Sequence, residues 1–462
     1  MEKHPYTKER QVVQSEEVLS SKSISTIPSS KIDLRFSGSS PIQFLIPDIL
    51  IQIFMMAIPR DIEWSQAEWN RIAPNNVAAV SRYWRNVALS HAILWATFNL
   101  TDKWAHKSFL WNQLPLFMRR SGQTPFNLTL THLNLQDYTQ LTSIIHDHQH
   151  LCKHIKIEFQ NALYEYYLTP RRHDKEGIKL TDIPILETLH LRWTRFEAPA
   201  EVLLSNATSL TVLDLYGSFI LRFDDLTVLN LTDITLQSFE VTTTNDCLQL
   251  LQICPALENF SAEGCYIKGI EDSSYEVIYH PNLISLSLRF MEVSALQYIL
   301  QRLHLISLKQ LTIGSKDSGV DGVDVHRASA LISRSHCLLE SLDLRQSKKD
   351  EIVRCLKLSP NLKHLALYDG GRGEGDAMRD VIIQLALKGG DQVCPELKSI
   401  KLCFINLSQW PEDVVSMVYS RWHVEEGAVR NLESVILRFC GFTASKDLDD
   451  CRNEGLKLKI ID

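Results

Sequence analysis

The stretch ICPALENFSAEGCYI, residues 253–267, carries the pattern that decides the fold. Within it, Leu257, Phe260 and Ala262 form an apolar-x-x-apolar-x-apolar phrase. The end of the phrase alternates between apolar and polar residues, which predicts a short strand with one buried face. A single unit of this kind cannot bury its apolar side alone. The stretch therefore predicts packing against other units of the same design.

The phrase recurs from about residue 150 to the C-terminal end, and successive copies start 21 to 35 residues apart. The expected copies are Cys152/Ile155/Ile157, Leu186/Leu189/Leu191, Leu210/Leu213/Leu215, Leu236/Phe239/Val241, Leu257/Phe260/Ala262, Leu283/Leu286/Leu288, Leu308/Leu311/Ile313, Leu339/Leu342/Leu344, Leu362/Leu365/Leu367, Leu397/Ile400/Leu402 and Leu432/Val435/Leu437. A further copy, Leu226/Leu229/Leu231, is out of step, and we expect it in a connecting segment. Repeats at this spacing stack into a solenoid.

The segments between the phrases are often apolar at helical spacing. Helices are expected over Cys247–Cys254, Ala295–Leu303 and Ala377–Leu387, and a closing strand over Gly455–Ile460. The expected fold class is therefore α/β, an irregular solenoid with a parallel sheet on its concave inner side and helices outside. The pattern resembles the leucine-rich repeat, and Cys265 and Cys440 in the ninth position of their phrases resemble its cysteine-containing class.

A separate helical unit precedes the repeats and begins IPDILIQIFMMAIP at Ile46. Its apolar residues lie on one helical face at Ile46, Ile49, Leu50, Ile53, Phe54 and Ala57. The remaining circumference is also mostly apolar, so this short helix must be buried on more than one side. It is too short to span a bilayer, which takes about 20 apolar residues. We expect one side to pack on neighbouring helices and the other to contact a partner protein.

A second helix is expected to start at Pro74-Asn75-Asn76 and to carry Val77, Val80 and Trp84 inward. The whole unit resembles the F-box. The matching residues are the Ile46-Pro47-Asp48 opening, the Ile53-Phe54 pair, Val80-Ser81-Arg82-Tyr83-Trp84-Arg85 and Leu94-Trp95. The resemblance implies a three-helix F-box.

An F-box followed by repeats resembles F-box/leucine-rich-repeat proteins of the divergent fungal type. The resemblance implies a substrate-recognition adaptor of an SCF-type cullin–RING ubiquitin ligase. The F-box would bind a Skp-type adaptor, and through it a cullin scaffold, while the repeats would bind the protein substrate. The expected organisation is a disordered tail over residues 1–40, the F-box over 42–98, a helical and strand connector over 99–149, and repeats over 150–462.

Two sets of residues are expected to contact partners. The set for the Skp-type adaptor is Pro47, Ile49, Leu50, Ile53, Phe54, Val80 and Trp84. Buried apolar and aromatic anchors of this kind dominate protein interfaces, although Ile53, Val80 and Trp84 can equally belong to the chain's own core.

The set for the substrate occupies the position after the third apolar residue of the phrase, on the concave face. It comprises Arg192, Tyr216, Arg289, Arg345, Tyr368 and Arg438. Arginines and tyrosines in this row can form a recognition stripe for an acidic or phosphorylated peptide. An ordinary solvated face is the alternative, and the sequence leaves both open.

Composition excludes several classes of function. The 462 residues are 45% hydrophobic and carry a formal net charge of −7, so no basic surface for nucleic acid is expected. The ten cysteines form no Cys-x-x-Cys pair and no secretory signal precedes them, which predicts reduced thiols and a cytoplasmic or nuclear location, without membrane attachment.

No catalytic chemistry is expected. His146 and His150 have the spacing of helical metal ligands, but no Cys or HExxH motif accompanies them. The glycine-rich segment 368–376 lacks the Gly-Lys-Ser/Thr of a phosphate-binding loop. We expect no enzyme activity, cofactor or metal site. The alternative function is a leucine-rich-repeat interaction scaffold without ligase coupling, in which the helical unit only caps the solenoid.

Overall fold

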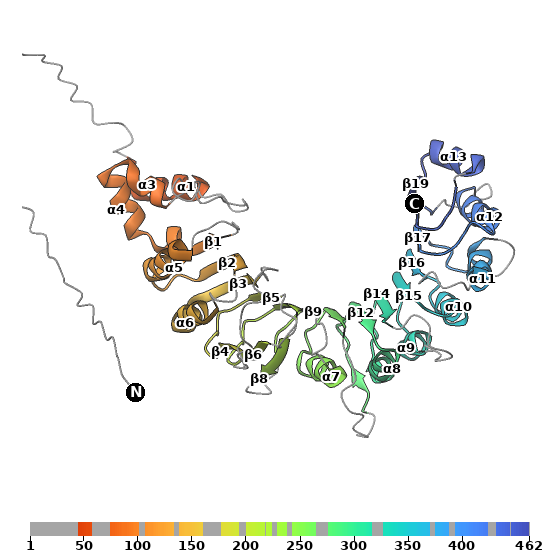
Figure 1. The fold of residues 1–462 in the computed structure, drawn as a ribbon, viewed down its shortest axis with the longest axis horizontal. Coiled ribbons are helices and arrows are strands. Elements are labelled where there is room, and N and C mark those ends of the chain that lie inside the picture. The colour runs from red at the N-terminus through yellow and green to blue at the C-terminus, as the bar shows by residue number, and fades with distance from the viewer. Residues whose placement is uncertain are drawn as a thin grey trace, which may run out of the picture. The chain divides into compact units, whose positions relative to one another are not determined.

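The computed structural model describes residues 45–57, 74–100, 107–133, 138–159, 177–193, 200–217, 219–223, 229–237, 243–264, 276–316, 327–369, 375–387, 393–423, 431–443 and 445–461 (Figure 1). The chain divides into Met1–Ile46 and Pro47–Asp462, and every element below belongs to the second unit. The predicted tail over residues 1–40 lies outside the described residues, and the predicted domain boundaries stay predictions. The α/β class is confirmed by a large parallel sheet and its accompanying helices.

The first described elements are the helices α1 (Pro47–Ala57), α3 (Asn75–Val80) and α4 (Arg82–Ser90) and the 3-10 helix η2 (Ala92–Trp95). The predicted continuous second helix is wrong, because the backbone of Ser81 is extended, with φ −154° and ψ 166°. Its hydroxyl accepts a hydrogen bond from the Trp84 amide at 3.1 Å and so caps α4. As the last residue of α3, Val80 points outward and is 61% exposed, not buried as expected.

Among the described residues, fourteen parallel strands form the main sheet, and they follow one another in chain order. They are β1 (Thr97–Leu100), β2 (Phe126–Leu133), β3 (Cys152–Phe159), β5 (Thr188–Trp193), β7 (Val212–Gly217), β9 (Asp233–Gln237), β10 (Asn259–Glu263), β12 (Ser285–Met291), β14 (Gln310–Ser315), β15 (Ser341–Arg345), β16 (His364–Tyr368), β17 (Ser399–Cys403), β18 (Ser434–Arg438) and β19 (Lys457–Ile461). The last of these is the predicted closing strand. The sheet starts at β1, before the predicted repeats.

The repeated phrase sets the register of the sheet. Leu342 of β15 pairs with Leu365 of β16, and Leu344 pairs with Leu367, and the same two rows continue into the neighbouring strands. These four leucines are each 1% exposed. Burying a leucine side chain contributes roughly 1.5–3 kcal/mol, so the stacked rows form a continuous core along the sheet.

One copy of the phrase was expected in the wrong place. Strand β9 buries Ile234 and Leu236, so its phrase is Leu231/Ile234/Leu236 and not Leu236/Phe239/Val241. The residue that follows its third apolar position is therefore Gln237, whereas Phe239 and Val241 lie outside the described residues.

Helices lie along one side of the sheet (Figure 1). They are α5 (Lys107–Ser121), α6 (Tyr138–His148), α7 (Thr244–Ile253), α8 (Val293–Gln301), α9 (Ala328–Ser335), α10 (Lys349–Leu358), α11 (Gly375–Leu385), α12 (Pro411–Trp422) and α13 (Lys446–Asn453), with the 3-10 helix η4 (Gln149–Leu151). From α7 onward each packs on its neighbour in the chain. The three predicted repeat helices are confirmed as α7, α8 and α11.

The outer layer is not helical throughout, which corrects the expectation of helices outside. Three short strands, β4 (Gly177–Leu180), β6 (Ala200–Leu204) and β8 (Phe219–Phe223), form a second parallel sheet on that side (Figure 1). A two-stranded sheet, β11 (Ile278–Tyr279) with β13 (Leu303–His304), follows. Ala200, Val202 and Leu204 are buried, so these strands fill the layer that helices occupy elsewhere.

Candidate interaction surfaces

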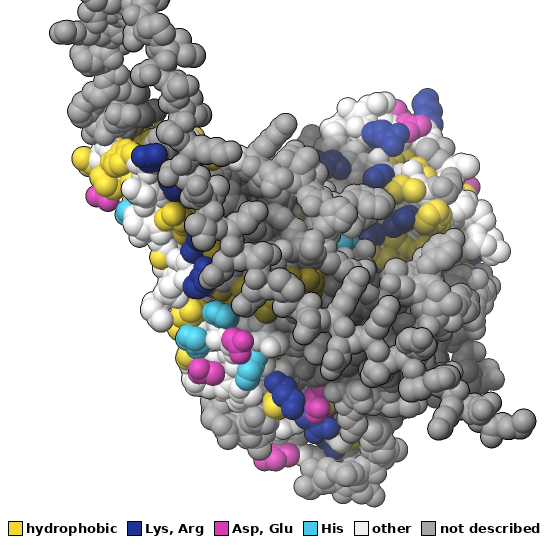
Figure 2. Space-filling model, turned by 60° about the vertical axis from the view of Figure 1, so that its left-hand side comes forward, with side chains coloured by type: hydrophobic (Ala, Val, Ile, Leu, Met, Phe, Trp, Pro, Cys, Tyr) yellow, Lys and Arg dark blue, Asp and Glu magenta, His cyan; other side chains and the backbone are white. Residues whose placement is uncertain are grey.

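Helix α1 exposes a stripe of large apolar side chains. Ile49, Ile53 and Met56 are 40%, 42% and 87% exposed, and they recur at a helical spacing of three to four residues. Val80 of α3 adds a further exposed side chain. Hydrophobic side chains gather in Figure 2 at the upper left, where these first helices lie. We name Ile49, Ile53, Met56 and Val80 the apolar stripe.

The opposite side of α1 is core. Leu50 and Phe54 have no exposed surface, and the Phe54 ring lies 4.9 Å from the Trp84 ring, centroid to centroid. The expectation that Leu50 and Phe54 contact a partner directly is therefore corrected: they hold α1 on α4. Trp84 is half-buried in the same contact, which gives it a supporting role as well. Pro47, Ile49, Ile53 and Val80 remain accessible from the predicted set.

The second surface is the side of the main sheet away from the helices, which we call the open face. It is formed by the side chains that alternate with the buried apolar rows, for example Ser341, Asp343 and Arg345 on β15. Parallel strands lie about 4.8 Å apart, so residues paired in register are neighbours on this face.

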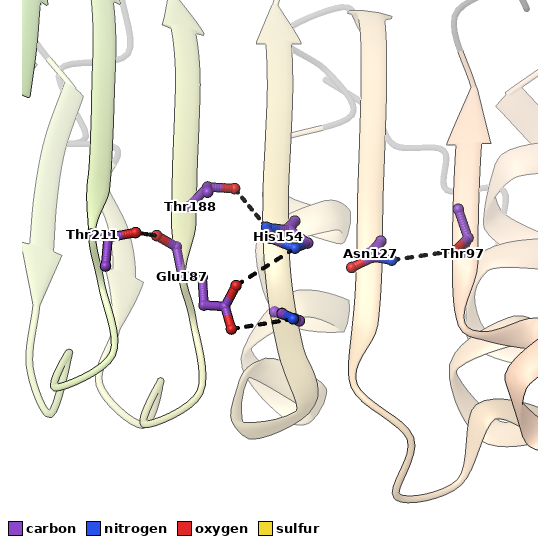
Figure 3. A network of polar contacts seen from close by, with 7 residues as sticks. Thr97, Asn127, His154, Glu187, Thr188 and Thr211 are labelled. Carbon is purple, nitrogen blue, oxygen red and sulfur yellow. Dashed lines mark hydrogen bonds and ion pairs between the residues drawn. The ribbon is translucent and has the colours of Figure 1, made fainter. Parts of the chain in front are cut away.

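At the N-terminal strands, the polar side chains of the open face are satisfied by one another. His154 and Thr188 point toward each other from neighbouring strands (Figure 3), and His154 Nδ1 lies 2.9 Å from Thr188 Oγ1. Lys153 Nζ lies 3.2 Å from a Glu187 carboxylate oxygen. Burial lowers the pKa of the His154 imidazole, although the charge of Glu187 opposes this shift. An ion pair between Lys156 and Glu158 at 3.3 Å and a hydrogen bond between His190 Nδ1 and Asp214 Oδ2 at 3.2 Å continue the pattern. In this part of the face, Lys153, Lys156 and His190 thus lie beside carboxylates.

The predicted substrate stripe lies on the open face, but its arginines differ in their contacts. The guanidinium of Arg192 stacks on Tyr216 at 4.4 Å. Arg289 lies 3.5 Å from the Glu263 carboxylate, so its charge is compensated.

Further along the face, Arg345 has a carboxylate partner, whereas Arg438 has none among the described residues. Arg345 lies 3.3 Å from Asp343 and also stacks on Tyr368 at 4.2 Å. Arg438 is exposed and stacks on Phe439 at 5.0 Å. The predicted row is thus divided into paired and unpaired arginines.

Three residues that the sequence did not single out lie beside Arg438. Lys401 on β17 reaches over the Tyr368 ring at 5.2 Å. Phe404 and Phe439 stack with centroids 5.1 Å apart and ring planes inclined by 27°, and they are 46% and 43% exposed. The signal in the sequence was that each Phe directly follows the last residue of its strand.

Both phenylalanines adopt left-handed backbone conformations, with φ 58° at Phe404 and φ 54° at Phe439. Gly264 occupies the corresponding position after β10. In all three turns the backbone amide donates a hydrogen bond to a carbonyl near the end of the next strand, namely that of Arg289, Arg438 or Ile461. The turn therefore requires positive φ. Glycine meets that requirement without cost, whereas an L-residue loses about 1–2 kcal/mol.

The thiols are not arranged for catalysis. Burial raises the pKa of Cys152 and Cys254 to about 12 and that of Cys394 to about 11. A thiolate nucleophile needs a lowered pKa instead. Among the described residues, no group of three or more His, Cys, Asp or Glu side chains is placed to hold a metal ion. No helix in that part of the chain has the length and apolarity to cross a membrane.

Comparison with protein-family models finds no match to this chain, and comparison with curated proteins finds none either.

Proposed function

We propose that the chain is a substrate-recognition adaptor of an SCF-type cullin–RING ubiquitin ligase. Its helical unit, an F-box, binds a Skp-type adaptor and through it a cullin scaffold. Its leucine-rich repeats bind the protein to be ubiquitinated. This role needs no catalytic residue in the chain itself, and it places the protein in the cytoplasm or the nucleus.

The observation that carries the proposal is the apolar stripe. The side chains of Ile49, Ile53 and Met56 are exposed to solvent. Exposed apolar side chains that cluster in this way mark interaction surfaces. Leu50 and Phe54 fix the opposite side of the same helix. The stripe is therefore presented on a rigid support, which lowers the entropy lost on binding.

The open face supports the second half of the proposal. Its strands place long rows of side chains in register over the full sheet. Extended sheets of stacked repeats serve as protein-binding surfaces. Two separate surfaces, one apolar and one mixed polar, fit a chain that connects two proteins.

A scaffold without ligase coupling is the second candidate, and one observation favours it. Helices α1 and α5 both pack on η2, which also packs on β1 at the start of the sheet, and the Trp95 Nε1 donates to the Ala88 carbonyl at 2.8 Å. The helical unit thus covers the first strands, as a cap does. A cap explains the buried side of α1 but not its apolar stripe.

Affinity purification of the tagged full chain from fungal cell extract tests the proposal. The wild-type chain is expected to capture a Skp subunit and a cullin. Ile53→Asp should lose both, while the matched change Ile383→Asp, at a 43%-exposed isoleucine on α11, should keep them. Failure of the wild-type chain to capture a Skp subunit would favour the scaffold.

A further inference from the structure

We propose that the C-terminal end of the open face binds an extended acidic segment of the partner protein, with apolar residues between its carboxylates. The site consists of Lys401, Arg438, Lys459, Tyr368, Phe404 and Phe439, which we call the cation–aromatic cluster. The inference deepens the proposed function by giving the chemistry of the substrate, and its biological meaning rests on that function.

The charge of the cluster is the first argument. On the N-terminal strands of the open face, Lys153, Lys156 and His190 have carboxylate partners. Among the described residues, no carboxylate forms an ion pair with Lys401, Arg438 or Lys459. Burial raises the pKa of the Cys403 thiol, and the positive charges of Lys401 and Arg438 oppose this rise more strongly than the negative charge of Asp343 adds to it. A chain with a net charge of −7 thus keeps an uncompensated positive site.

The spacing of the cations is the second argument. Lys401 pairs in register with Ile436, which pairs with Lys459, so the two ammonium-bearing positions are two strands apart. At about 4.8 Å per strand they are separated by roughly 10 Å. An extended segment rises about 3.3 Å per residue, so carboxylates three residues apart can meet both lysines. Ile436 between them offers an apolar contact.

The same spacing argues against a single phosphate as the ligand. Phosphate recognition converges several donors on one group, often through bidentate arginine. Arg345 on β15 is engaged by Asp343 at 3.3 Å, so among the described residues Arg438 is the guanidinium of the cluster without a carboxylate partner. Separated cations suit several carboxylates better than one doubly charged group.

The aromatic side chains are the third argument. Phe404 and Phe439 are exposed and stacked on each other, at turn positions of positive φ that Gly264 and Gln346 occupy after other strands. The rings lie beside Arg438 and give the segment an apolar platform next to its ionic contacts. Figure 2 shows Lys and Arg side chains next to hydrophobic ones on the right-hand part of the molecule, where the last strands lie.

Fluorescence anisotropy with the full chain and labelled peptides tests the inference. The probe is a 12-residue peptide with Glu or Asp at every third position and Leu between, and the comparison peptide replaces the acids with Gln and Asn. Binding of the acidic probe is expected, at least tenfold tighter than the neutral peptide, and it should weaken as salt rises. The double variant Lys401→Gln/Arg438→Gln should bind the acidic probe at least tenfold more weakly than the wild type.

Two further variants make the outcome specific. Lys153→Gln/Lys156→Gln removes two paired lysines from the same face and should bind within twofold of the wild type. Phe404→Ala/Phe439→Ala should weaken binding about tenfold while keeping the salt dependence. Equal binding by wild type and Lys401→Gln/Arg438→Gln would overturn the inference. So would tighter binding of single-stranded oligothymidine, or of a neutral peptide with one phosphoserine.

The measurement is independent of the ligase. It uses no Skp subunit, so loss of peptide binding with intact Skp capture overturns only this inference. Intact peptide binding without Skp capture overturns the ligase role and leaves the site in place.

Discussion

The rings of Phe54 and Trp84 lie 4.9 Å apart, centroid to centroid, with their planes inclined by 56°. This pair joins α1 to α4, because Phe54 is fully buried and Trp84 is half-buried against it. Aromatic pairs in such tilted arrangements contribute about 0.5–1.5 kcal/mol beyond the area they bury. The contact also fixes which side of α1 remains outside, namely the side that bears Ile49 and Ile53.

Phe54→Ala should therefore destabilise the helical unit by roughly 3–5 kcal/mol, as truncation of a buried aromatic does. It should also reduce binding of the Skp-type adaptor, since the stripe loses its support. Hydrogen exchange of the α1 and α4 amides measures the stability directly. Phe54→Leu, which keeps apolar volume, is the control and should lose much less. Unchanged exchange in Phe54→Ala would show that α1 does not depend on this contact.

Substitution of Arg421 should lower the free energy of unfolding more than substitution of an exposed arginine does. It is 3% exposed, and its guanidinium donates to the carbonyls of Leu385 at 2.6 Å, Val393 at 2.7 Å and Cys394 at 2.8 Å. A lysine cannot reach all three carbonyls, and unpaired buried acceptors cost about 1–3 kcal/mol each.

We expect Arg421→Lys to lower the free energy of unfolding by roughly 3 kcal/mol, measured by urea denaturation. Arg354→Lys on the exposed side of α10 is the matched control and should stay within about 0.5 kcal/mol of the wild type. Equal urea midpoints for Arg421→Lys and Arg354→Lys would mean that the three carbonyls accept hydrogen bonds from other donors.

Alkaline pH should weaken the fold through its buried thiols. The pKa of Cys152 and Cys254 is raised to about 12 in the folded chain, whereas in the unfolded chain these thiols ionise at their ordinary pKa. The folded state thus binds more protons in this window. Stability from these groups is fully present below the ordinary thiol pKa and is lost as pH rises toward 12.

Each such thiol should reduce the free energy of unfolding by up to about 1.4 kcal/mol per pH unit within that window. Urea denaturation at pH 8 and pH 10 measures the loss. Cys254→Ala removes one contribution and should lose less between the two pH values than the wild type. Identical losses would indicate that other groups govern the alkaline transition.

Sequence periodicity predicts the core of the repeats well, because burial on one face of a strand imposes a strict alternation. Leu342 and Leu344 were identified this way, as were the helices α7, α8 and α11. The same rule misplaced β9, since Leu231/Ile234/Leu236 and Leu236/Phe239/Val241 both satisfy the phrase and share Leu236. It also missed the outer strands such as β6, because a run of five residues such as AEVLL suits a helix as well as a strand.

The surfaces were less predictable than the core. The row of arginines was found, but Glu263 and Arg289 are 26 residues apart, and only the strand register brings them together. Leu50 and Phe54 were assigned to the interface because an apolar helix does not reveal which of its faces its own chain covers. Ser81 interrupts the expected helix because its hydroxyl accepts a hydrogen bond from the Trp84 amide and so starts a new helix. Such a bond between side chain and backbone competes with a continuous helix, and the spacing of apolar residues does not reveal it.

The most direct measurement is the affinity of the purified full chain for a fungal Skp-type adaptor by isothermal titration calorimetry. The wild-type chain should bind one adaptor. Ile53→Asp should reduce the binding free energy by roughly 2 kcal/mol or more, about 30-fold in affinity, as the loss of an interface anchor does. Ile383→Asp should bind within twofold of the wild type. No heat of binding with the wild-type chain, or equal affinities for Ile53→Asp and Ile383→Asp, would contradict the proposed adaptor role.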